Sequence, residues 1–374
     1  SGALLKRKTK LLFLLCFLIP SVVYSYEFPP ERTKREADKE LGWLFAPLPG
    51  CVEGVGCAVP IAGLISNFYK STDLVILKTL AKGDIEATVV QLQKFPIIDE
   101  KLFLKFLYYD WDISFLSYDR GIHSGKNDYY QTFENLNTST INLQSQFYNQ
   151  HLEIQIGYSS GGTKISKIFD ADGNQFSNIQ SPLRTWVDHT IGTQIDLTDN
   201  HLEPREGIRF ELLHNASNYG LSELSDYDVN SLNLTTYIPF LGSDTLLINV
   251  FQSRSYISEH GLTDENALRK KFGLGCDFEM EADACLDTET KRINYWRKRN
   301  QSGKATGLGG LNRMRAYSLG RFYAGNSSNY ALEYRLNFSE KQTPINWIIM
   351  GGMRTVLQAS FFYEVGGVSD DISQ

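Results

Sequence analysis

Residues 152–158 read Leu-Glu-Ile-Gln-Ile-Gly-Tyr, and apolar side chains alternate strictly with polar or small ones along this stretch. The same period of two returns in residues 330–338, which read Tyr-Ala-Leu-Glu-Tyr-Arg-Leu-Asn-Phe. Successive side chains of a β-strand point to opposite faces, so this pattern predicts strands with one apolar and one polar face. Because the period of two persists beyond residue 41, the sequence predicts an all-β fold.

The environment of these strands depends on features other than the period. A soluble β-sandwich hides its apolar face in a core, whereas a membrane β-barrel turns that face to lipid, and both alternate. Runs such as residues 101–111 and 228–240 reach the roughly ten residues that a tilted membrane strand requires. Aromatic residues make up 13% of the chain, which suits the interfacial girdles of a barrel, although secreted β proteins also use them. Strand length therefore favours a transmembrane antiparallel β-barrel of the outer-membrane type.

The N-terminus has the features of an export signal. Basic residues at positions 6–10 precede an apolar run over residues 11–23, and Ser25 provides a small residue for cleavage. The apolar run is too short to span a bilayer comfortably, and no later stretch reaches about 18 consecutive apolar residues. Export without a membrane helix leaves the periplasm, secretion or the outer membrane, and together with the strand pattern we expect the outer membrane of a Gram-negative bacterium. The expected parts of the chain are a cleaved signal peptide over residues 1–25, a charged linker over residues 26–41 and the barrel domain over residues 42–374.

Two pairs of cysteines stand close together in the sequence, Cys51 with Cys57 and Cys276 with Cys285. Both pairs lie in loop-like surroundings. In an oxidising compartment each pair could form a local disulfide. A metal site is not expected, because no histidine stands near these cysteines at ligand spacing.

The sequence lacks the motifs that carry catalysis or cofactor binding. A Gly-x-Ser-x-Gly turn, a His-Glu-x-x-His motif and a phosphate-binding Gly-Lys-Ser or Gly-Lys-Thr run are all missing, and the histidines are scattered. The net charge of -6 does not suggest a nucleic-acid partner. We expect no enzymatic activity, no cofactor, and no catalytic or metal-binding residue.

One long connection, about residues 257–327, shows no clean strand pattern, and a series of short motifs begins near its end. A loop this long is uncommon unless it is functional or disordered. The motifs are, in order, Leu308-Gly309-Gly310, Met314-Arg315-Ala316-Tyr317, Gly320-Arg321-Phe322, Leu332-Glu333-Tyr334-Arg335 and Phe362-Tyr363-Glu364-Val365-Gly366, and Pro204-Arg205-Glu206-Gly207-Ile208 stands upstream of them. In order and spacing these motifs resemble the BamA/TamA-like bacterial surface antigen family of outer-membrane β-barrels. The large loop of that family carries a Gly-Gly step and a Val-Arg-Gly-Tyr or Val-Arg-Gly-Phe motif.

The resemblance implies that the long loop folds back into the lumen and places Arg315 against acidic residues of the wall. Glu364 is the expected partner and Glu333 the alternative, because strand alternation turns both away from lipid. An arginine in a confined lumen needs carboxylates, since burial of an unpaired charge is costly. Gly366 is expected to leave room for the loop. The residues of this expected lumen latch are Arg315, Tyr317, Glu333, Arg335, Phe362, Glu364 and Gly366, with Gly309 and Gly310 as loop glycines.

The resemblance also implies a role in the insertion or transport of proteins at the outer membrane. The expected partners are the lipid bilayer and lipopolysaccharide, together with client outer-membrane proteins or a separate periplasmic partner. Only the short linker separates the expected signal peptide from Gly42, so no POTRA module is expected before the barrel. We also expect the barrel to be incomplete at its C-terminal end. A passive porin-like channel for small solutes, constricted by the long loop, is the alternative.

Overall fold

The computed structural model describes most of the chain beyond the predicted linker. The predicted signal peptide over residues 1–25 lies outside the described residues, as does most of the predicted linker over residues 26–41. The described residues are 29–30, 41–47, 49–52, 56–70, 72–79, 85–176, 179, 181–276, 283–338, 343–355 and 357–370.

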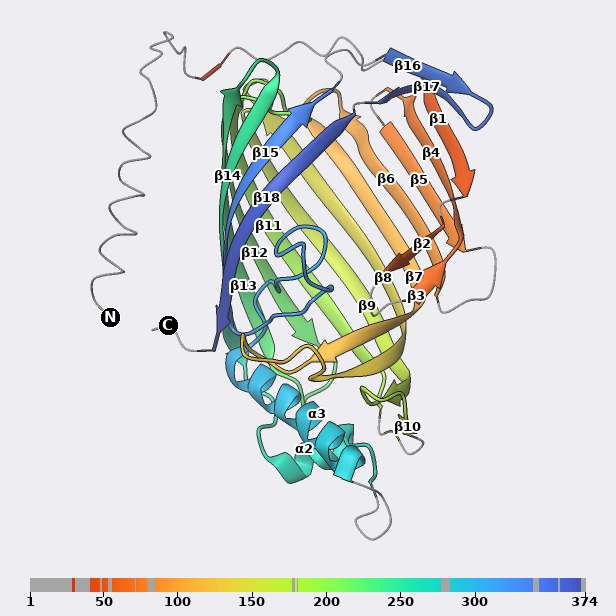
Figure 1. Cartoon of the computed structure of the whole chain (residues 1–374), viewed down its shortest axis with the longest axis vertical. Helices are drawn as coiled ribbons and strands as arrows, with labels where there is room; N and C mark the ends of the chain where they lie inside the picture. Colours follow the sequence, from red (N-terminus) through yellow and green to blue (C-terminus); the bar gives the residue numbers. More distant parts are fainter. Residues whose placement is uncertain are drawn as a thin grey trace, which may run out of the picture.

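One antiparallel sheet of 16 strands forms the body of the molecule and curves into a barrel-like wall (Figure 1). Each long strand pairs with the next long strand along the chain, and the short β10 (Gln175–Phe176) pairs back on β9. This arrangement confirms the predicted all-β fold. The strands of the wall are β1 (Gly42–Pro47), β4 (Pro60–Tyr69), β5 (Thr72–Thr79), β6 (Glu86–Ile98), β7 (Leu102–Tyr118), β8 (Tyr129–Phe147), β9 (Leu152–Phe169), β11 (Arg184–Thr198), β12 (Gly207–Tyr219), β13 (Asp226–Phe240), β14 (Asp244–Glu259), β15 (Asn326–Asn337) and β18 (Gln358–Ser369).

The two ends of the sheet are not joined directly in the described part of the chain. β18 is the last strand on one side, and the hairpin of β16 (Thr343–Trp347) and β17 (Met350–Thr355) adds to β1 on the other side. This hairpin lies between β15 and β18 in sequence, so it reaches from the end of the sheet to its beginning at one rim (Figure 1). The described wall is thus an open barrel, as the prediction of an incomplete barrel requires.

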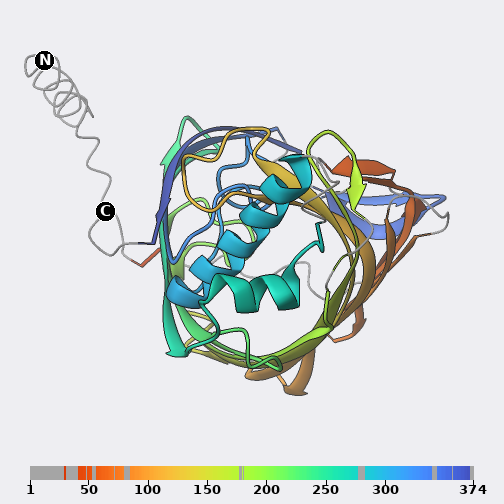
Figure 2. The same ribbon diagram turned by 90° about the horizontal axis from the view of Figure 1, so that it is seen from below.

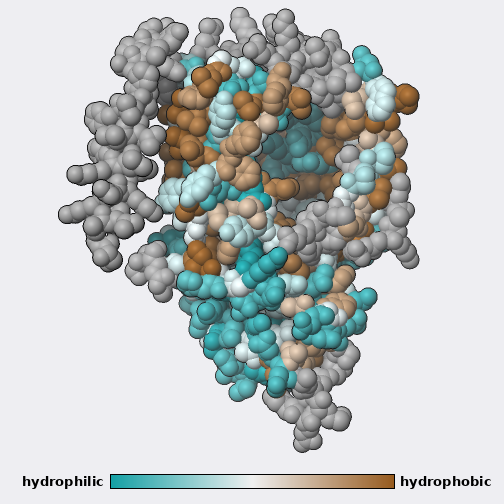
Figure 3. Space-filling model, viewed as in Figure 1, coloured by the Kyte–Doolittle hydropathy of each residue, from teal (hydrophilic) through white to brown (hydrophobic). Residues whose placement is uncertain are grey.

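The two faces of the wall have opposite polarity. Apolar side chains such as those of Ile156, Ile191 and Leu332 are exposed, whereas the carboxylates of Glu153 and Glu333 are buried on the inner face. Figure 3 shows apolar side chains gathered over the strands and a hydrophilic surface over the helices below them. A soluble core has the reverse arrangement, and an apolar outside around a polar lumen is typical of a membrane barrel.

The connection between β14 and β15 contains helices that the sequence analysis missed. β14 continues to Glu259 and β15 begins at Asn326, so the connection is shorter than the expected 257–327. Its described part contains α2 (Glu265–Phe272) and α3 (Asp283–Ser302), which lie across one mouth of the barrel (Figures 1 and 2). The expectation of one irregular loop inside the lumen was therefore wrong for the helical part. Neither helix is long and apolar enough to cross a bilayer.

Local sequence explains α2. The Asp264 side chain accepts a hydrogen bond from the Ala267 N–H at 2.9 Å and so caps the first turn. Leu268 and Phe272 are fully buried against α3, where the Phe272 ring stacks on Trp296 with 4.9 Å between ring centroids. A short helix of this kind depends on such packing for its stability.

The buried face of α3 carries cations, which is why this helix was not recognised. Arg292 and Arg299 are both buried. The central guanidinium carbon of Arg299 lies 4.6, 5.6 and 5.1 Å from the ring centroids of Tyr219, Tyr227 and Trp296. Aromatic faces stabilise a cation without a carboxylate partner. Because charged residues occupy the inner face, the apolar period of 3.6 is weak and the stretch resembles a polar loop.

A disulfide joins Cys276 and Cys285, between the two helices, with 6.0 Å between the Cα atoms. Both cysteines belong to an apolar cluster with Tyr130 of β8 and with Ile165 and Ile168 of β9. The disulfide therefore also lies against the part of the wall that extends toward the helices.

The second cysteine pair lies in a small hairpin between β1 and β4. This hairpin consists of β2 (Gly50–Val52) and β3 (Gly56–Ala58), and it places Cys51 opposite Cys57. Cys57 is disulfide-bonded.

Protein isolated without reductant should resist alkylation at Cys276 and Cys285, and reduction should make both thiols reactive. A disulfide that closes a loop with a sequence separation of 9 restricts the unfolded chain. Replacement of both cysteines by serine should therefore lower the free energy of local opening of the helices by about 2–3 kcal/mol. Peptide mass spectrometry would follow the thiols, and hydrogen exchange would follow α2 and α3. Alkylation of both thiols before reduction would contradict the assignment.

Candidate functional site

After α3 the chain turns into the barrel as an inserted segment, defined here as residues 303–325 (Figure 1). Leu308 and Phe322 form an antiparallel bridge, and their N–H groups donate to each other's C=O groups at 2.8 and 2.9 Å. Leu308 packs with Ala324 and with Val368 of β18, and Met314 and Phe322 border this cluster. The inserted segment is therefore a doubled-back loop that rests on the inner face of β18.

Gly309 and Gly310 form the turn of the inserted segment. Their φ angles are +107° and +108°, in a region that favours glycine. The Gly309 N–H donates to the C=O of Arg313 at 2.9 Å, and the Gly310 N–H donates to the C=O of Tyr317 at 3.0 Å. A Cβ atom on Gly309 would lie 2.3 Å from the Ser318 carbonyl oxygen, so the chain leaves no room for a side chain there.

Arg315 lies at the centre of a group of wall residues. Its Nε donates to Glu364 Oε1 at 3.1 Å, and its backbone N–H donates to Glu364 Oε2 at 2.7 Å. One of its terminal nitrogens lies 2.9 Å from Glu333 Oε2, and its central guanidinium carbon lies 3.7 Å from the centroid of the Phe362 ring. Arg335 Nε donates to the other Glu333 oxygen at 2.7 Å. We call Arg315, Glu333, Arg335, Phe362 and Glu364 the lumen cluster.

The lumen cluster is balanced in charge and removed from bulk water. The Glu364 and Glu333 side chains are 6% and 7% exposed, and the Arg315 side chain is 23% exposed. Each carboxylate thus receives a guanidinium in a partly desolvated place, where charge-assisted hydrogen bonds are strong. Loss of Arg315 would leave the buried Glu333 with Arg335 alone and would remove the guanidinium partner of the buried Glu364.

Of the other expected latch residues, Gly366 has the expected role and Tyr317 lies outside the lumen cluster. A Cβ atom on Gly366 would lie 2.8 Å from Leu308 Cδ1 and 3.2 Å from Met314 Sδ, so this glycine makes room for the inserted segment. Tyr317 is half-exposed, and its ring packs edge-on against Phe322 with 5.0 Å between centroids. Tyr317 thus shapes the inserted segment and is not a member of the lumen cluster.

The alanine in the arginine motif is compatible with the backbone. Ala316 replaces the glycine of the family motif, but it is not among the described residues with positive φ. The left-handed residue of the motif is Met314, with a φ of +52°. The left-handed conformation therefore falls on Met314 and not on residue 316, so the methyl side chain of Ala316 causes no backbone strain.

Two further arginines that the sequence analysis did not assign hold the base of the inserted segment. Arg120 donates through Nε to the Asp370 carboxylate at 2.8 Å and through a terminal nitrogen to the Gly303 carbonyl at 2.7 Å. Arg321 donates to the Gly125 carbonyl at 2.7 Å. Arg321 belongs to the Gly-Arg-Phe motif, so the sequence offered a reason to single it out. No sequence pattern indicates that Arg120 contacts Asp370.

Electrostatics favour the Arg120–Asp370 contact at neutral pH. Burial alone would raise the pKa of the Asp370 carboxyl. The hydrogen bond and the charge of Arg120, together with the Gly325 N–H, outweigh burial and hold that pKa below its ordinary value. Asp370 therefore stays ionised. As the last described residue, it ties the end of β18 to the base of the inserted segment through Arg120.

Comparison with known proteins yields structural neighbours only. No protein-family model matches the sequence, and no curated protein sequence matches it. The chain is similar in structure to BamA from Haemophilus ducreyi lacking POTRA domains 1–3, with a TM-score of 0.43 and 10% identity, over 83% of this chain and 55% of that one. It is also similar to CdiB from Acinetobacter baumannii, with a TM-score of 0.45 and 10% identity, over 88% of this chain and 50% of that one. The chain thus spans about half the length of both.

Removal of Arg315 should destabilise the barrel. Arg315→Ala leaves Glu333 and Glu364 buried without their shared partner, which should lower the free energy of unfolding by about 3 kcal/mol. Glu364→Gln should act in the same direction, and the double variant should lose less than the sum of the two. The charge swap of Arg315→Glu with Glu364→Arg should recover part of the loss. Urea unfolding in detergent, followed by mobility in unheated gels, would measure these effects.

Arg254→Ala is the matched control. Arg254 is on β14, where its guanidinium stacks on the exposed ring of Tyr256 at 4.8 Å from the centroid. Its loss removes an arginine from the wall without touching the lumen cluster, so stability should change little. Equal losses for Arg315→Ala and Arg254→Ala, or strict additivity of Arg315→Ala with Glu364→Gln, would exclude coupling within the cluster.

Proposed function

We propose that this protein is an outer-membrane β-barrel similar to the BamA/TamA-like family, and that it acts in the insertion or transport of proteins at the outer membrane. The observation that carries the proposal is the contact of Arg315 with Glu333 and Glu364. Three of the motifs that resemble the family meet in this contact, namely those that contain Arg315, Glu333 and Glu364. Their agreement in space supports a shared mechanism that depends on conformation, and we propose a role without catalysis.

The outer surface supports a membrane location. Large apolar side chains of β18, such as Phe361, Tyr363 and Val365, are exposed to the surroundings. Lipid would cover such side chains favourably, at about 25 cal/mol for each square ångström removed from water. Every backbone N–H and C=O within a bilayer also needs an internal partner, which a sheet curved into a barrel provides.

The ends of the sheet support a role with client strands. β18 pairs with β15, and no other described strand pairs with it. β1 pairs with β17 through only Trp43 and Leu44. An edge strand offers a row of backbone hydrogen-bonding groups to another strand, so β18 is suited to transient pairing with an incoming protein. In this proposal the lumen cluster holds the last strands steady while a client pairs.

The partners that follow from this proposal are the lipid bilayer, lipopolysaccharide, client outer-membrane proteins and a separate periplasmic partner. Export through the predicted signal peptide is part of the same proposal.

A porin-like channel is a second candidate, favoured by the empty space in the lumen. Cavities of about 350 and 380 Å³ share Leu213, Ser231 and Thr306 in their linings. They therefore adjoin each other beside the inserted segment. Small solutes would use such a space, whereas protein insertion would not require it.

The mature protein should fractionate with outer membranes and should migrate faster in unheated detergent gels than after boiling. A curved sheet with paired strands resists detergent until it is heated. Immunoblots of separated membrane and periplasmic fractions would check both points. Recovery of the protein in the soluble periplasm would exclude the membrane location.

Proteoliposomes that contain the protein should accelerate the insertion of an unfolded small β-barrel substrate over protein-free liposomes. Arg315→Ala should reduce this acceleration about tenfold or more, a change of about 1.4 kcal/mol in the barrier, because in this proposal the lumen cluster holds the last strands in place while a client pairs. Arg254→Ala should behave as the wild type. The share of substrate with folded gel mobility over time gives the rate.

Planar-bilayer recordings on the same preparation separate the two candidates. Stable solute-selective pores without any acceleration of insertion would favour the channel and overturn the insertion role. Acceleration of insertion that depends on Arg315 would support the proposal.

A further inference from the structure

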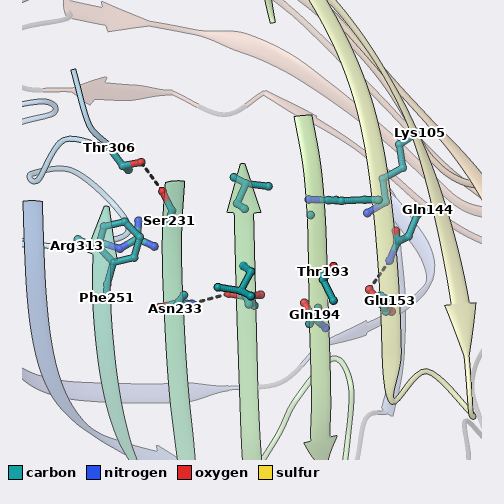
Figure 4. Close-up of a pocket in the computed structure, with 15 residues that line it drawn as sticks. Lys105, Gln144, Glu153, Thr193, Gln194, Ser231, Asn233, Phe251, Thr306 and Arg313 are labelled. Carbon is teal, nitrogen blue, oxygen red and sulfur yellow. Dashed lines mark hydrogen bonds between the residues drawn. The ribbon is translucent and has the colours of Figure 1, made fainter. Parts of the chain in front are cut away.

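The inserted segment carries a second arginine, Arg313, that turns away from the lumen cluster. Its central guanidinium carbon lies 3.4 Å from the centroid of the Phe251 ring on β14, so the flat guanidinium covers the ring face. Arg313 and Phe251 lie on one side of the cavity of about 350 Å³ in the lumen (Figure 4). Because stacking uses the face of the guanidinium, its N–H groups are left at the edge for other partners.

The hydrogen-bonding capacity of the Arg313 guanidinium is unused among the described residues. None of them accepts a hydrogen bond from this group or forms an ion pair with it. Glu211, which also lines the cavity, attracts Arg313 electrostatically without reaching it. One Glu211 oxygen instead accepts a hydrogen bond from Asn233 Nδ2 at 2.6 Å. A guanidinium that is held by a ring and left without an acceptor is prepared for a ligand.

A second cation with free donors, Lys105 of β7, lines the opposite side of the cavity (Figure 4). No described residue accepts a hydrogen bond from its ammonium group. The nearby carboxylate of Glu153 already accepts hydrogen bonds from the side-chain amides of Gln144 and Gln146. The acidic groups of the cavity are thus partly occupied, while both of its cations keep their donors free.

Two amide atoms on the wall of the cavity also have no partner. Gln144 Oε1 and Gln194 Nε2 are buried and make no hydrogen bond with the described residues. Buried polar atoms are almost always satisfied by protein, water or a ligand, so these two atoms indicate an occupant.

We propose that this cavity binds a small organic anion, with a carboxylate or phosphate group on the Arg313 guanidinium and further contacts to Lys105 and Gln194. The planar fork of an arginine suits both groups. The volume lies at the small end of the range for ligand pockets, roughly 300–1,000 Å³. The inference does not rest on a role in protein insertion, because binding is measured on purified protein without clients.

Calorimetric titration in detergent would test the site with four probes. Succinate and glycerol phosphate carry the two anionic groups, and succinamide and glycerol are their neutral counterparts. At least one anionic probe should bind, and its neutral counterpart should bind at least tenfold more weakly. The anion that binds more tightly identifies the group. Failure of both anionic probes to bind more tightly than the neutral ones would overturn the proposal, and the cavity would hold water only.

Variants of opposite charge sharpen the test. Arg313→Gln and Lys105→Gln should each weaken binding of the anionic probe about tenfold to a hundredfold, since each removes a charge-assisted hydrogen bond. Glu211→Gln should strengthen binding severalfold, because it removes a repelling carboxylate and keeps the acceptor for Asn233. A purely structural role of these residues would weaken binding in all three variants, and this outcome would contradict the proposal.

Arg254→Gln serves as the control for a lost positive charge on the wall and should bind as the wild type does. Gel mobility before and after heating shows that each variant is folded. If Arg313→Gln fails to fold, Lys105→Gln and Glu211→Gln decide the question by the opposite signs of their effects. Equal affinity for the anionic probe in the wild type and in Lys105→Gln and Glu211→Gln would exclude the site.

Discussion

The antiparallel hydrogen-bond ladder from β1 to β18 is the constraint on which the rest of the molecule depends. Buried backbone N–H and C=O groups need partners, so each strand inside the sheet needs a neighbour on either side. Pairings between long strands that follow one another in sequence supply most of these neighbours, and the β16–β17 hairpin adds to β1. Once the apolar face is turned outward, the polar residues of every strand must gather inside.

Because polar residues face inward, ion pairs and charge-assisted hydrogen bonds determine how the lumen is packed. Glu153, Glu211, Glu333 and Glu364 all project from strands into a confined space, and each accepts hydrogen bonds from amides or guanidinium groups there. The wall supplies Lys105 and Arg335, and the inserted segment adds Arg313 and Arg315. Arg315 binds carboxylates of β15 and β18, whereas the Arg313 guanidinium stacks on the Phe251 ring and keeps its N–H donors free among the described residues. The inserted segment therefore complements the wall chemically as well as filling it.

The sequence predicted those features that depend on local spacing. A period of two in residues 152–158 and 330–338 placed Glu153 and Glu333 on the inner face, and the motif order brought Arg315 to Glu364. Features that depend on distant partners were missed. Arg120 and Asp370 are 250 residues apart, and nothing near either residue indicates the other. α3 was missed because its buried face carries Arg292 and Arg299, and the pairing of β17 with β1 could not be derived from two short apolar stretches.

The position of Arg315 has a consequence for how β15 and β18 align along each other. Glu333 stands directly opposite Phe362, and Glu364 stands opposite Ala331, two residues further along. Arg315 therefore contacts both members of the Glu333–Phe362 cross-strand pair and the diagonal neighbour Glu364, so its contacts depend on the alignment of the two strands. A slip of one residue would turn Glu364 to the outer face of the wall. A slip of two residues in one direction would separate the two carboxylates by about 7 Å more along the strands, and a slip in the other direction would place them directly opposite each other, where like charges repel. The contacts of Arg315, a single side chain of the inserted segment, are thus complete only when β15 and β18 pair in this register.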